Sequence, residues 1–198
     1  MQAKVLRLIQ QGNSELPEKH WIRSAAARYL GVMIWEEGYG LTGVAASELR
    51  QRELYLDAIK MTKAVHGLDL SEDAALQEVP KVANNLLYFA LDYLQSGGNA
   101  DNLAAAGFAE SDINMWLQEM GANEPTRLPS VSTADTARRA FVYSRDHAKA
   151  CAAAQRVLTL LPLSKADTMS RYHLKMRREA ESTLSSLDCV EFGINAKT

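Results

Sequence analysis

The feature that most constrains the fold is the segment at residues 81–95, KVANNLLYFALDYLQ, which is apolar on almost every side when drawn as a helix. A helix of this kind is normally central in its domain. We therefore predict a central apolar helix over about residues 81–95. The uncharged part of this segment, Val82 to Leu91, has only ten residues, whereas a membrane span requires roughly 20, so we expect no membrane segment. The expected core side chains are Leu86, Leu87, Phe89, Leu91 and Leu94.

Apolar residues recur with a helical period along nearly the whole chain, which predicts an all-α fold. We expect a multi-helix bundle that ends in a C-terminal hairpin of two long helices. Pro80 is expected to kink or divide the helix that begins near Ser71. The buried stripe of the helix that ends near Glu37 is expected at Trp21, Ala25, Tyr29, Val32 and Met33. The other expected helices cover residues 3–11, 44–66, 100–106, 110–120, 134–161 and 165–187.

The segment at residues 121–133, GANEPTRLPSVST, has two prolines and little periodicity, as linkers do. It separates an expected N-terminal helical domain, residues 1–125, from an expected C-terminal helical hairpin and short tail, residues 134–198. The alternative is that both parts pack as one domain. Ser164 and Asp167 are spaced as a capping box at the start of the last helix.

The net charge of −2 conceals an uneven distribution. Residues 1–50 carry six basic and five acidic side chains, residues 51–130 carry five and twelve, and residues 131–198 carry eleven and seven. A basic C-terminal part can bind nucleic acid or an acidic partner. It can equally pair with the acidic middle part inside one fold.

The chain has two cysteines, Cys151 and Cys189, too few for a disulfide framework or a thiolate metal cluster. We expect both thiols to be reduced and the protein to be cytoplasmic. Cys151 follows His147 by four residues on one expected helix, which is the spacing of a Cys–His nucleophile pair. Because Cys151 also lies on a stripe of small residues, we favour a buried, inert thiol.

Catalytic and cofactor motifs are weak. Gly38, Gly40 and Gly43 spell G-x-G-x-x-G, which binds dinucleotides only between a strand and a helix of a parallel sheet. No other strand is expected here, so we interpret the motif as a helix end and turn. No zinc-binding, P-loop or nucleophile-elbow pattern occurs. We predict that the protein is not an enzyme and has no cofactor and no metal.

Two segments are similar in pattern to helix-turn-helix units. Residues 99–120 could pack Leu103, Phe108 and Trp116 across a turn at Gly107, but the second helix is acidic and would be repelled by DNA. Residues 156–179 place a basic helix after a turn that contains Pro162, with Lys165 in its first turn. A plain helical hairpin with a charged, solvated face is the alternative for both.

Basic residues gather on the last two expected helices. Four of them, from Arg138 to Arg156, fall within about 20° of one line that is about 27 Å long, and three more align on the last helix. Such stripes can follow a phosphate backbone or bind an acidic protein. The candidate contact residues are Arg138, Arg145, Lys149, Arg156, Lys165, Arg171, Lys175 and Arg178.

These observations support two hypotheses. The first is a non-enzymatic regulatory or adaptor protein that binds another protein through its helical surface. The second is a small DNA- or RNA-binding regulator that uses the basic stripes. A helical bundle that holds a small molecule among its aromatic and methionine side chains is a third, weaker interpretation.

Overall fold

The computed structural model describes residues 21–44, 47–66, 72–161, 169–187 and 189. Helices account for most of these residues and no strand occurs among them, which confirms the all-α class. The chain forms two compact units, Met1–Trp116 and Leu117–Thr198. This division comes before the linker expected at residues 121–133, where the structure instead has a short 3-10 helix, η3 (Pro125–Arg127), and the first turn of α7.

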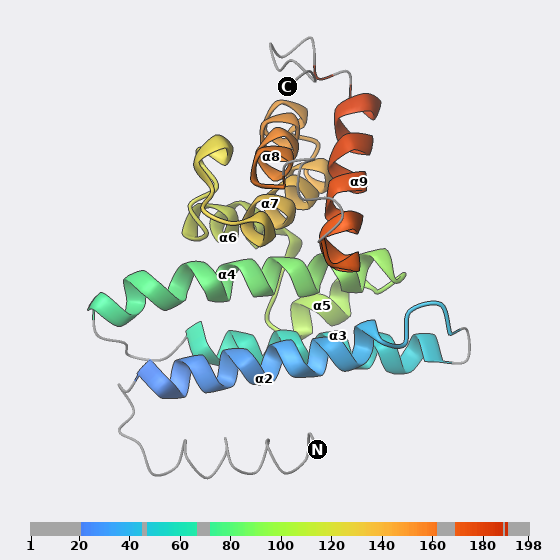
Figure 1. The fold of residues 1–198 in the computed structure, drawn as a ribbon. Coiled ribbons are helices and arrows are strands. Elements are labelled where there is room, and N and C mark those ends of the chain that lie inside the picture. Colours follow the sequence, from blue (N-terminus) through green and yellow to red (C-terminus); the bar gives the residue numbers. More distant parts are fainter. Residues whose placement is uncertain (1–20, 45–46, 67–71, 162–168, 188, 190–198) are drawn as a thin grey trace. The chain divides into compact units, whose positions relative to one another are not determined.

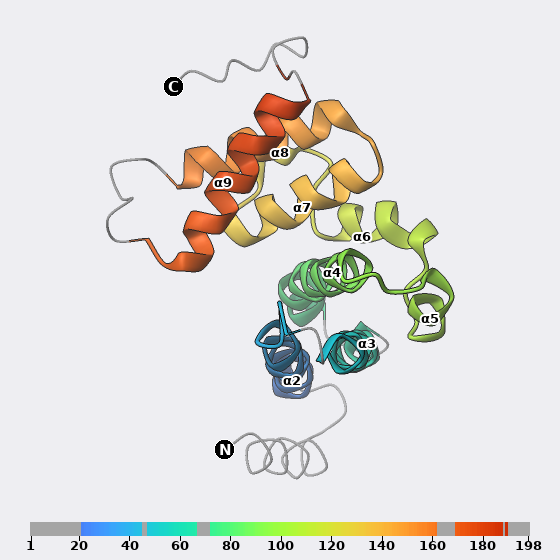
Figure 2. The ribbon, with the colours of Figure 1, turned by 90° about the vertical axis from the view of Figure 1, so that its right-hand side faces the viewer.

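Unit 1 is built on three helices that pack together. Figure 2 views them nearly end on, at the corners of a triangle, and Figure 1 shows α2 and α3 side by side along their length. Shorter helices follow the third. The bounds are α2 (Trp21–Tyr39), α3 (Glu48–His66), α4 (Glu72–Gln95), α5 (Ala100–Ala105), η2 (Glu110–Asp112) and α6 (Ile113–Glu119). The helix expected at residues 3–11 lies outside the described residues.

The helix α4 contains the apolar segment from which the fold was predicted. Leu86, Leu87, Phe89 and Leu91 are buried as expected, whereas Leu94 is only half-buried. The helix runs through Pro80 without interruption, so the expected division there is wrong. Proline removes one donor to the carbonyl four residues earlier. That residue, Leu76, is 72% exposed, so α4 loses this bond on a side that water reaches.

The helices α2 and α3 approach closely at Gly31. A β-carbon at this position would overlap Oγ1 of Thr62 and lie 3.2 Å from the carbonyl oxygen of Ala58. The buried line of α2 therefore passes through Leu30 and Gly31. The expected stripe is wrong at Tyr29, which is 57% exposed, with the Arg28 guanidinium 4.6 Å from the centre of its ring.

Trp35 joins α2 to α4 by both apolar and polar contacts. Its ring stacks on Phe89 at 5.8 Å between centroids and meets Tyr88 edge-on at 5.3 Å. Its indole Nε1 donates a hydrogen bond of 2.8 Å to Asp92. Aromatic pairs of this geometry contribute beyond the area they bury, and a buried indole N–H normally has an acceptor.

Glu78 forms a second polar link within unit 1. It accepts hydrogen bonds from Arg28 Nε at 3.0 Å and from Lys81 Nζ at 2.8 Å. Burial by itself raises the pKa of this carboxyl. The two cationic donors outweigh burial, so the pKa of Glu78 is lowered below its ordinary value. Glu78 is therefore ionised and bound to α2 at neutral pH.

The segment from α5 to α6 is a structural helical hairpin. Leu103, Phe108 and Trp116 are buried as expected, and the last two rings are stacked at 6.4 Å between centroids. Gly107 has φ +92°, and the amides of residues 107 and 108 bond to the carbonyls of residues 104 and 103. This is a Schellman ending, which favours glycine because the conformation is left-handed.

In the described residues of unit 2, η3 is followed by the helices α7, α8 and α9, and α8 packs against both α7 and α9. The expected helix over residues 134–161 is two helices, so that prediction is wrong. Arg145 has φ +60°, its amide bonds to Val142 O at 3.2 Å, and the Asp146 amide bonds to Phe141 O at 2.9 Å. This is again a Schellman ending, here without glycine. The bounds are α7 (Val131–Tyr143), α8 (His147–Leu160) and α9 (Arg171–Ser186).

Candidate interaction surface

The turn between α7 and α8 breaks the longer of the two expected basic stripes. Arg138 lies on α7, Arg145 lies in the turn, and Lys149 and Arg156 lie on α8. Since the helical register restarts at Asp146, these four residues do not share one line. Asp146 caps α8 by accepting a hydrogen bond of 3.2 Å from the Lys149 amide. The 27 Å stripe predicted from the sequence does not exist.

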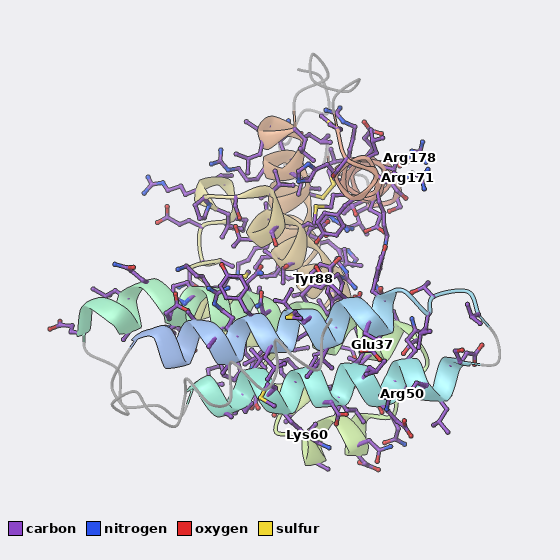
Figure 3. All side chains as sticks on the ribbon, turned by 60° about the horizontal axis from the view of Figure 1, so that its bottom comes forward. Glu37, Arg50, Lys60, Tyr88, Arg171 and Arg178 are labelled. Carbon is purple, nitrogen blue, oxygen red and sulfur yellow. A yellow bond between two sulfur atoms is a disulfide. The ribbon has the colours of Figure 1, made fainter. Side chains whose placement is uncertain are left out.

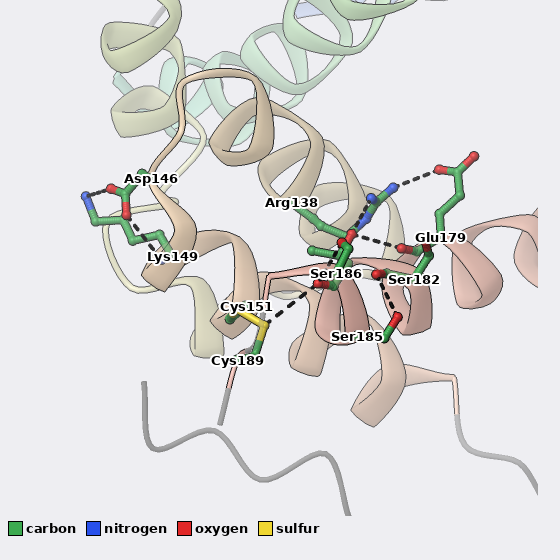
Figure 4. The surroundings of a disulfide bond; sticks show 10 residues. Arg138, Asp146, Lys149, Cys151, Glu179, Ser182, Ser185, Ser186 and Cys189 are labelled. Carbon is green, nitrogen blue, oxygen red and sulfur yellow. Dashed lines mark hydrogen bonds and ion pairs between the residues drawn. A yellow bond between two sulfur atoms is a disulfide. The ribbon is translucent and has the colours of Figure 1, made fainter. Parts of the chain in front are cut away.

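Arg138 is buried, although an outward-facing side chain was expected. Its Nε and Nη2 donate to Asp135 Oδ1 at 2.9 and 2.7 Å, and Nη2 also meets Glu179 Oε2 at 2.7 Å. Its Nη1 donates to Thr183 Oγ1 at 3.0 Å. Figure 4 shows Arg138 reaching from α7 to Glu179 on α9. Every nitrogen of this guanidinium is therefore engaged inside the unit, and Arg138 cannot contact a partner.

Asp135 is the buried anion of this cluster, with a side chain only 2% exposed. Burial raises its pKa, and the negative charge of Glu179 adds to this effect. The cations Arg138 and Arg139 act in the opposite direction without cancelling it, so the pKa of Asp135 is raised overall. The charge on Asp135 therefore depends on Arg138.

The other cations of the longer stripe differ in their roles. Lys149 is exposed and lies 3.2 Å from Asp146, its own capping residue. Arg156 is half-buried and donates from Nε to the Leu128 carbonyl at 2.8 Å, which joins α8 to the segment after η3. Arg145 is exposed in the turn. Lys165 and the expected capping box at Ser164 lie outside the described residues, and α9 is capped by Ser170 instead.

The shorter stripe does exist, on α9. Arg171, Lys175 and Arg178 are all exposed, at successive spacings of four and three residues that keep them on one side of a helix. Figure 3 shows Arg171 and Arg178 on this helix. Within the part of the chain that the structure describes, neither of them forms an ion pair. We call Arg171, Lys175 and Arg178 the basic face.

Small polar side chains follow the basic face along the same side of α9. Ser182 and Ser185 extend the same spacing and are exposed. Lys175 Nζ lies 3.7 Å from Glu179 Oε1, a distance at which an exposed pair is weak. Seven residues separate Arg171 from Arg178, which is about 10 Å along the axis. The face is therefore compact and offers charge with little steric obstruction.

A disulfide between Cys151 and Cys189 was not foreseen. Both residues are buried, and their Cα atoms are 5.6 Å apart, within the usual range for this bond. The expectation that both thiols are reduced is wrong, although burial of Cys151 is confirmed. Because the sulfur of Cys151 is bonded, it is not a nucleophile that His147 could activate. The sequence signal was the pair of cysteines itself, one on the helix expected over residues 134–161 and the other just after the helix expected over residues 165–187.

Arg177 is a further residue that sequence reasoning missed. It is 8% exposed, and its Nη1 lies 3.7 Å from Glu181 Oε1. Its Nε and Nη2 are buried without a hydrogen-bond partner among the described residues. The signal in the sequence was its spacing, because Arg177 lies three and seven residues before Ala180 and Leu184, which are buried on the same side of α9.

Other motifs have structural roles. Gly38 belongs to the last turn of α2, and Gly43 has φ +83° in the turn that follows, so the glycine motif is a helix end as interpreted. The described residues contain no group of three metal-ligating side chains. None of their helices has the length and apolar character needed to cross a bilayer. No known family, curated protein or solved structure matches the chain.

Proposed function

We propose that this chain is a non-enzymatic, all-α interaction protein that binds an acidic segment of another protein through the basic face of α9. The observation that carries the proposal is the exposure of Arg171, Lys175 and Arg178 on one side of a single helix. Elsewhere on unit 2, Arg138 lies in a buried ion-pair cluster and Arg156 donates to a backbone carbonyl. Lys149 pairs with Asp146 at the surface, and Arg145 is exposed as a single cation in the turn between α7 and α8. Arg171 and Arg178 of the basic face are exposed and form no ion pair among the described residues, so a partner's carboxylates can reach both charges.

The geometry of the face suits an acidic helix. Carboxylates spaced alternately four and three residues apart on a partner helix would lie on one side of it, at the same pitch as Arg171, Lys175 and Arg178. Arginine can bind a carboxylate through two parallel hydrogen bonds, which adds geometric specificity to charge. The exposed serines at 182 and 185 would let the two backbones approach closely.

A nucleic acid is the alternative partner, and the structure favours it less. Duplex binding that rests on phosphates usually involves about six to ten contacts. The basic face supplies three cations over about 10 Å, and the longer stripe that would have extended it is absent. Glu179 and Glu181 also lie on α9 and would repel a phosphate backbone. We therefore rank an acidic protein segment first.

Fluorescence anisotropy tests the proposal with the full chain and two labelled probes. One probe is a helical peptide with glutamates spaced alternately four and three residues apart, and the other is a short DNA duplex. The test variant is R171A/R178A. The matched control is R50A/K60A, which removes two exposed cations from α3 that pair, among the described residues, with their near neighbours Glu53 and Asp57.

We expect the peptide to bind and R171A/R178A to weaken it by about tenfold or more, which corresponds to roughly 1.4 kcal/mol, while the control stays within about twofold. Strong binding of the duplex with a steep salt dependence, and none of the peptide, would instead establish the nucleic-acid alternative. Binding of neither probe, or equal weakening by both variants, would refute the proposal.

A cytoplasmic location remains a prediction from the sequence, and the disulfide now weighs against it. Disulfides persist in oxidising compartments and are rare in the cytosol, where they are usually transient and redox-active. If the protein is cytoplasmic, the cross-link between Cys151 and Cys189 should therefore be reversible there. Trapping free thiols by alkylation at the moment of cell lysis, followed by mass measurement, distinguishes the two situations.

A further inference from the structure

The helix α9 is attached to unit 2 by little apolar surface. Its buried apolar side chains among the described residues are Met176, Ala180 and Leu184. The remaining positions are mostly charged or hydroxylated. The hydrophobic contribution to stability scales with the apolar area removed from water. Docking of α9 is therefore stabilised by this effect far less than packing of α4 is.

Docking of α9 also carries a cost. Arg177 is buried with two guanidinium nitrogens, Nε and Nη2, that have no hydrogen-bond partner in the described part of the chain. Buried donors without acceptors lose their hydration and regain nothing. The bonds from Arg138 to Glu179 and Thr183 act in the opposite direction and hold the helix. Docking of α9 therefore has a cost as well as a gain.

The disulfide adds a covalent constraint that favours the docked state of α9. Cys151 lies on α8 among small residues that include Ala150 and Ala154, and Cys189 lies two residues after the C-cap of α9, Leu187. The two cysteines are 38 positions apart in the sequence, and the whole of α9 lies between them. Figure 4 shows the bond at the end of α9, beside α8. A cross-link at this place keeps the helix close to its docking surface whether or not its other contacts hold.

We propose that the Cys151–Cys189 bond is a redox-controlled latch for α9. In the oxidised chain α9 stays docked on α8. In the reduced chain the helix leaves it. The inference concerns the state of the fold and stands independently of what the basic face binds. In this proposal a covalent change, reduction of the disulfide, shifts α9 between a docked state and a released state, as in other protein switches.

The chemistry of the latch is thiol–disulfide exchange with a small dithiol or a dithiol protein as reductant. A thiolate of the reductant attacks one sulfur, a mixed disulfide forms, and the other cysteine leaves as a thiolate that takes up a proton. The second thiol of the reductant then displaces the first cysteine. Two electrons pass to the chain, the S–S bond becomes two S–H groups, and the reductant becomes a disulfide.

Amide hydrogen exchange read by mass spectrometry tests the latch in the full chain. The samples are the oxidised chain, the same chain reduced with dithiothreitol, and the C151A/C189A variant with and without the reductant. Alanine suits both positions because they are buried, and Cys151 already has alanine neighbours. Alkylation and mass measurement count the free thiols in each sample.

We expect amides of α9 to exchange about tenfold faster or more in the reduced chain, while those of α7 and α8 change by less than about twofold. The variant should behave as the reduced chain does, with no response to the reductant. The oxidised and reduced samples of the wild-type chain can be compared even if the variant fails to fold.

Three results would overturn the proposal. The first is unchanged protection of α9 when two free thiols are counted. The second is loss of protection across α7, α8 and α9 together, which would make the bond a staple for the whole unit. The third is the presence of two free thiols in the chain purified under oxidising conditions. None of these results bears on the binding test for the basic face.

Discussion

Replacing Arg138 with methionine removes the cation of the buried cluster in unit 2 and keeps the apolar stem. The wild-type side chain donates to Asp135, Glu179 and Thr183 over distances of 2.7 to 3.0 Å. Its loss leaves Asp135, whose side chain is 2% exposed, as a buried carboxylate without its closest cation. Breaking a buried pair in this way costs about 3 to 5 kcal/mol. We expect R138M to lose that much stability at pH 7.

The loss of stability in R138M should depend on pH, and the titration of Asp135 sets the direction of this dependence. The pKa of Asp135 in the folded chain is raised by burial above that of an unfolded aspartate, which is about 3.9. The folded state therefore binds this proton more tightly, and stability falls as pH rises from the unfolded pKa through the folded one. Removing Arg138 raises the folded pKa further. R138M should therefore be less destabilised at pH 5 than at pH 7.

Urea unfolding followed by circular dichroism at both pH values measures these effects. The matched control is R178M, which removes an exposed cation of the same helix pair and should stay within about 0.5 kcal/mol of the wild type. A double variant, D135L/R138M, removes both charges and should recover most of the loss, because apolar residues often replace a buried pair at little cost. The reasoning is refuted if R138M loses less than about 1 kcal/mol, or the same amount at both pH values.

Three further changes have expected outcomes. G98A should destabilise unit 1 by about 1 to 3 kcal/mol in thermal unfolding, because a β-carbon there overlaps the buried ring of Tyr93; an unchanged melting temperature would show that the ring can move aside. R145G should stabilise unit 2 by about 1 kcal/mol, since φ +60° favours glycine, and R145A should not; equal effects of the two variants would contradict this. C151A/C189A should lose the helical circular-dichroism signal of α9 to the same extent as the reduced wild-type chain, because a released helix of 16 residues is marginal in water; a variant that keeps this signal beside a reduced chain that loses it would contradict this.

Helix type and the central core were accessible from the sequence because they depend on local periodicity. The apolar positions of residues 81–95 predicted a buried helix, and Leu86, Leu87, Phe89 and Leu91 are buried. The glycine motif after α2 was correctly interpreted as a helix end, since it lacked the strand that a nucleotide site requires. These inferences needed only the spacing of residues within one element.

The single helix predicted over residues 134–161 was wrong because a helical period and a helix ending occur in the same segment. The period of residues 134–161 is helical throughout, but Ser144, Arg145 and Asp146 form a Schellman ending followed by an N-cap. An ending without glycine is hard to recognise, because a left-handed arginine is uncommon. Once the helix is divided, the angular relation between Arg138 and the later cations is lost.

By itself, then, the chain's order of residues determined that this protein is helical, which helix is central, and which side chains carry charge. Only the tertiary structure decided where those charges face: Arg138 turns inward to Asp135, while Arg171 and Arg178 remain in water. It also brought together Cys151 and Cys189, 38 residues apart. The physical reason is that periodicity acts over one or two helical turns, whereas pairing of charges and sulfurs depends on which helices become neighbours.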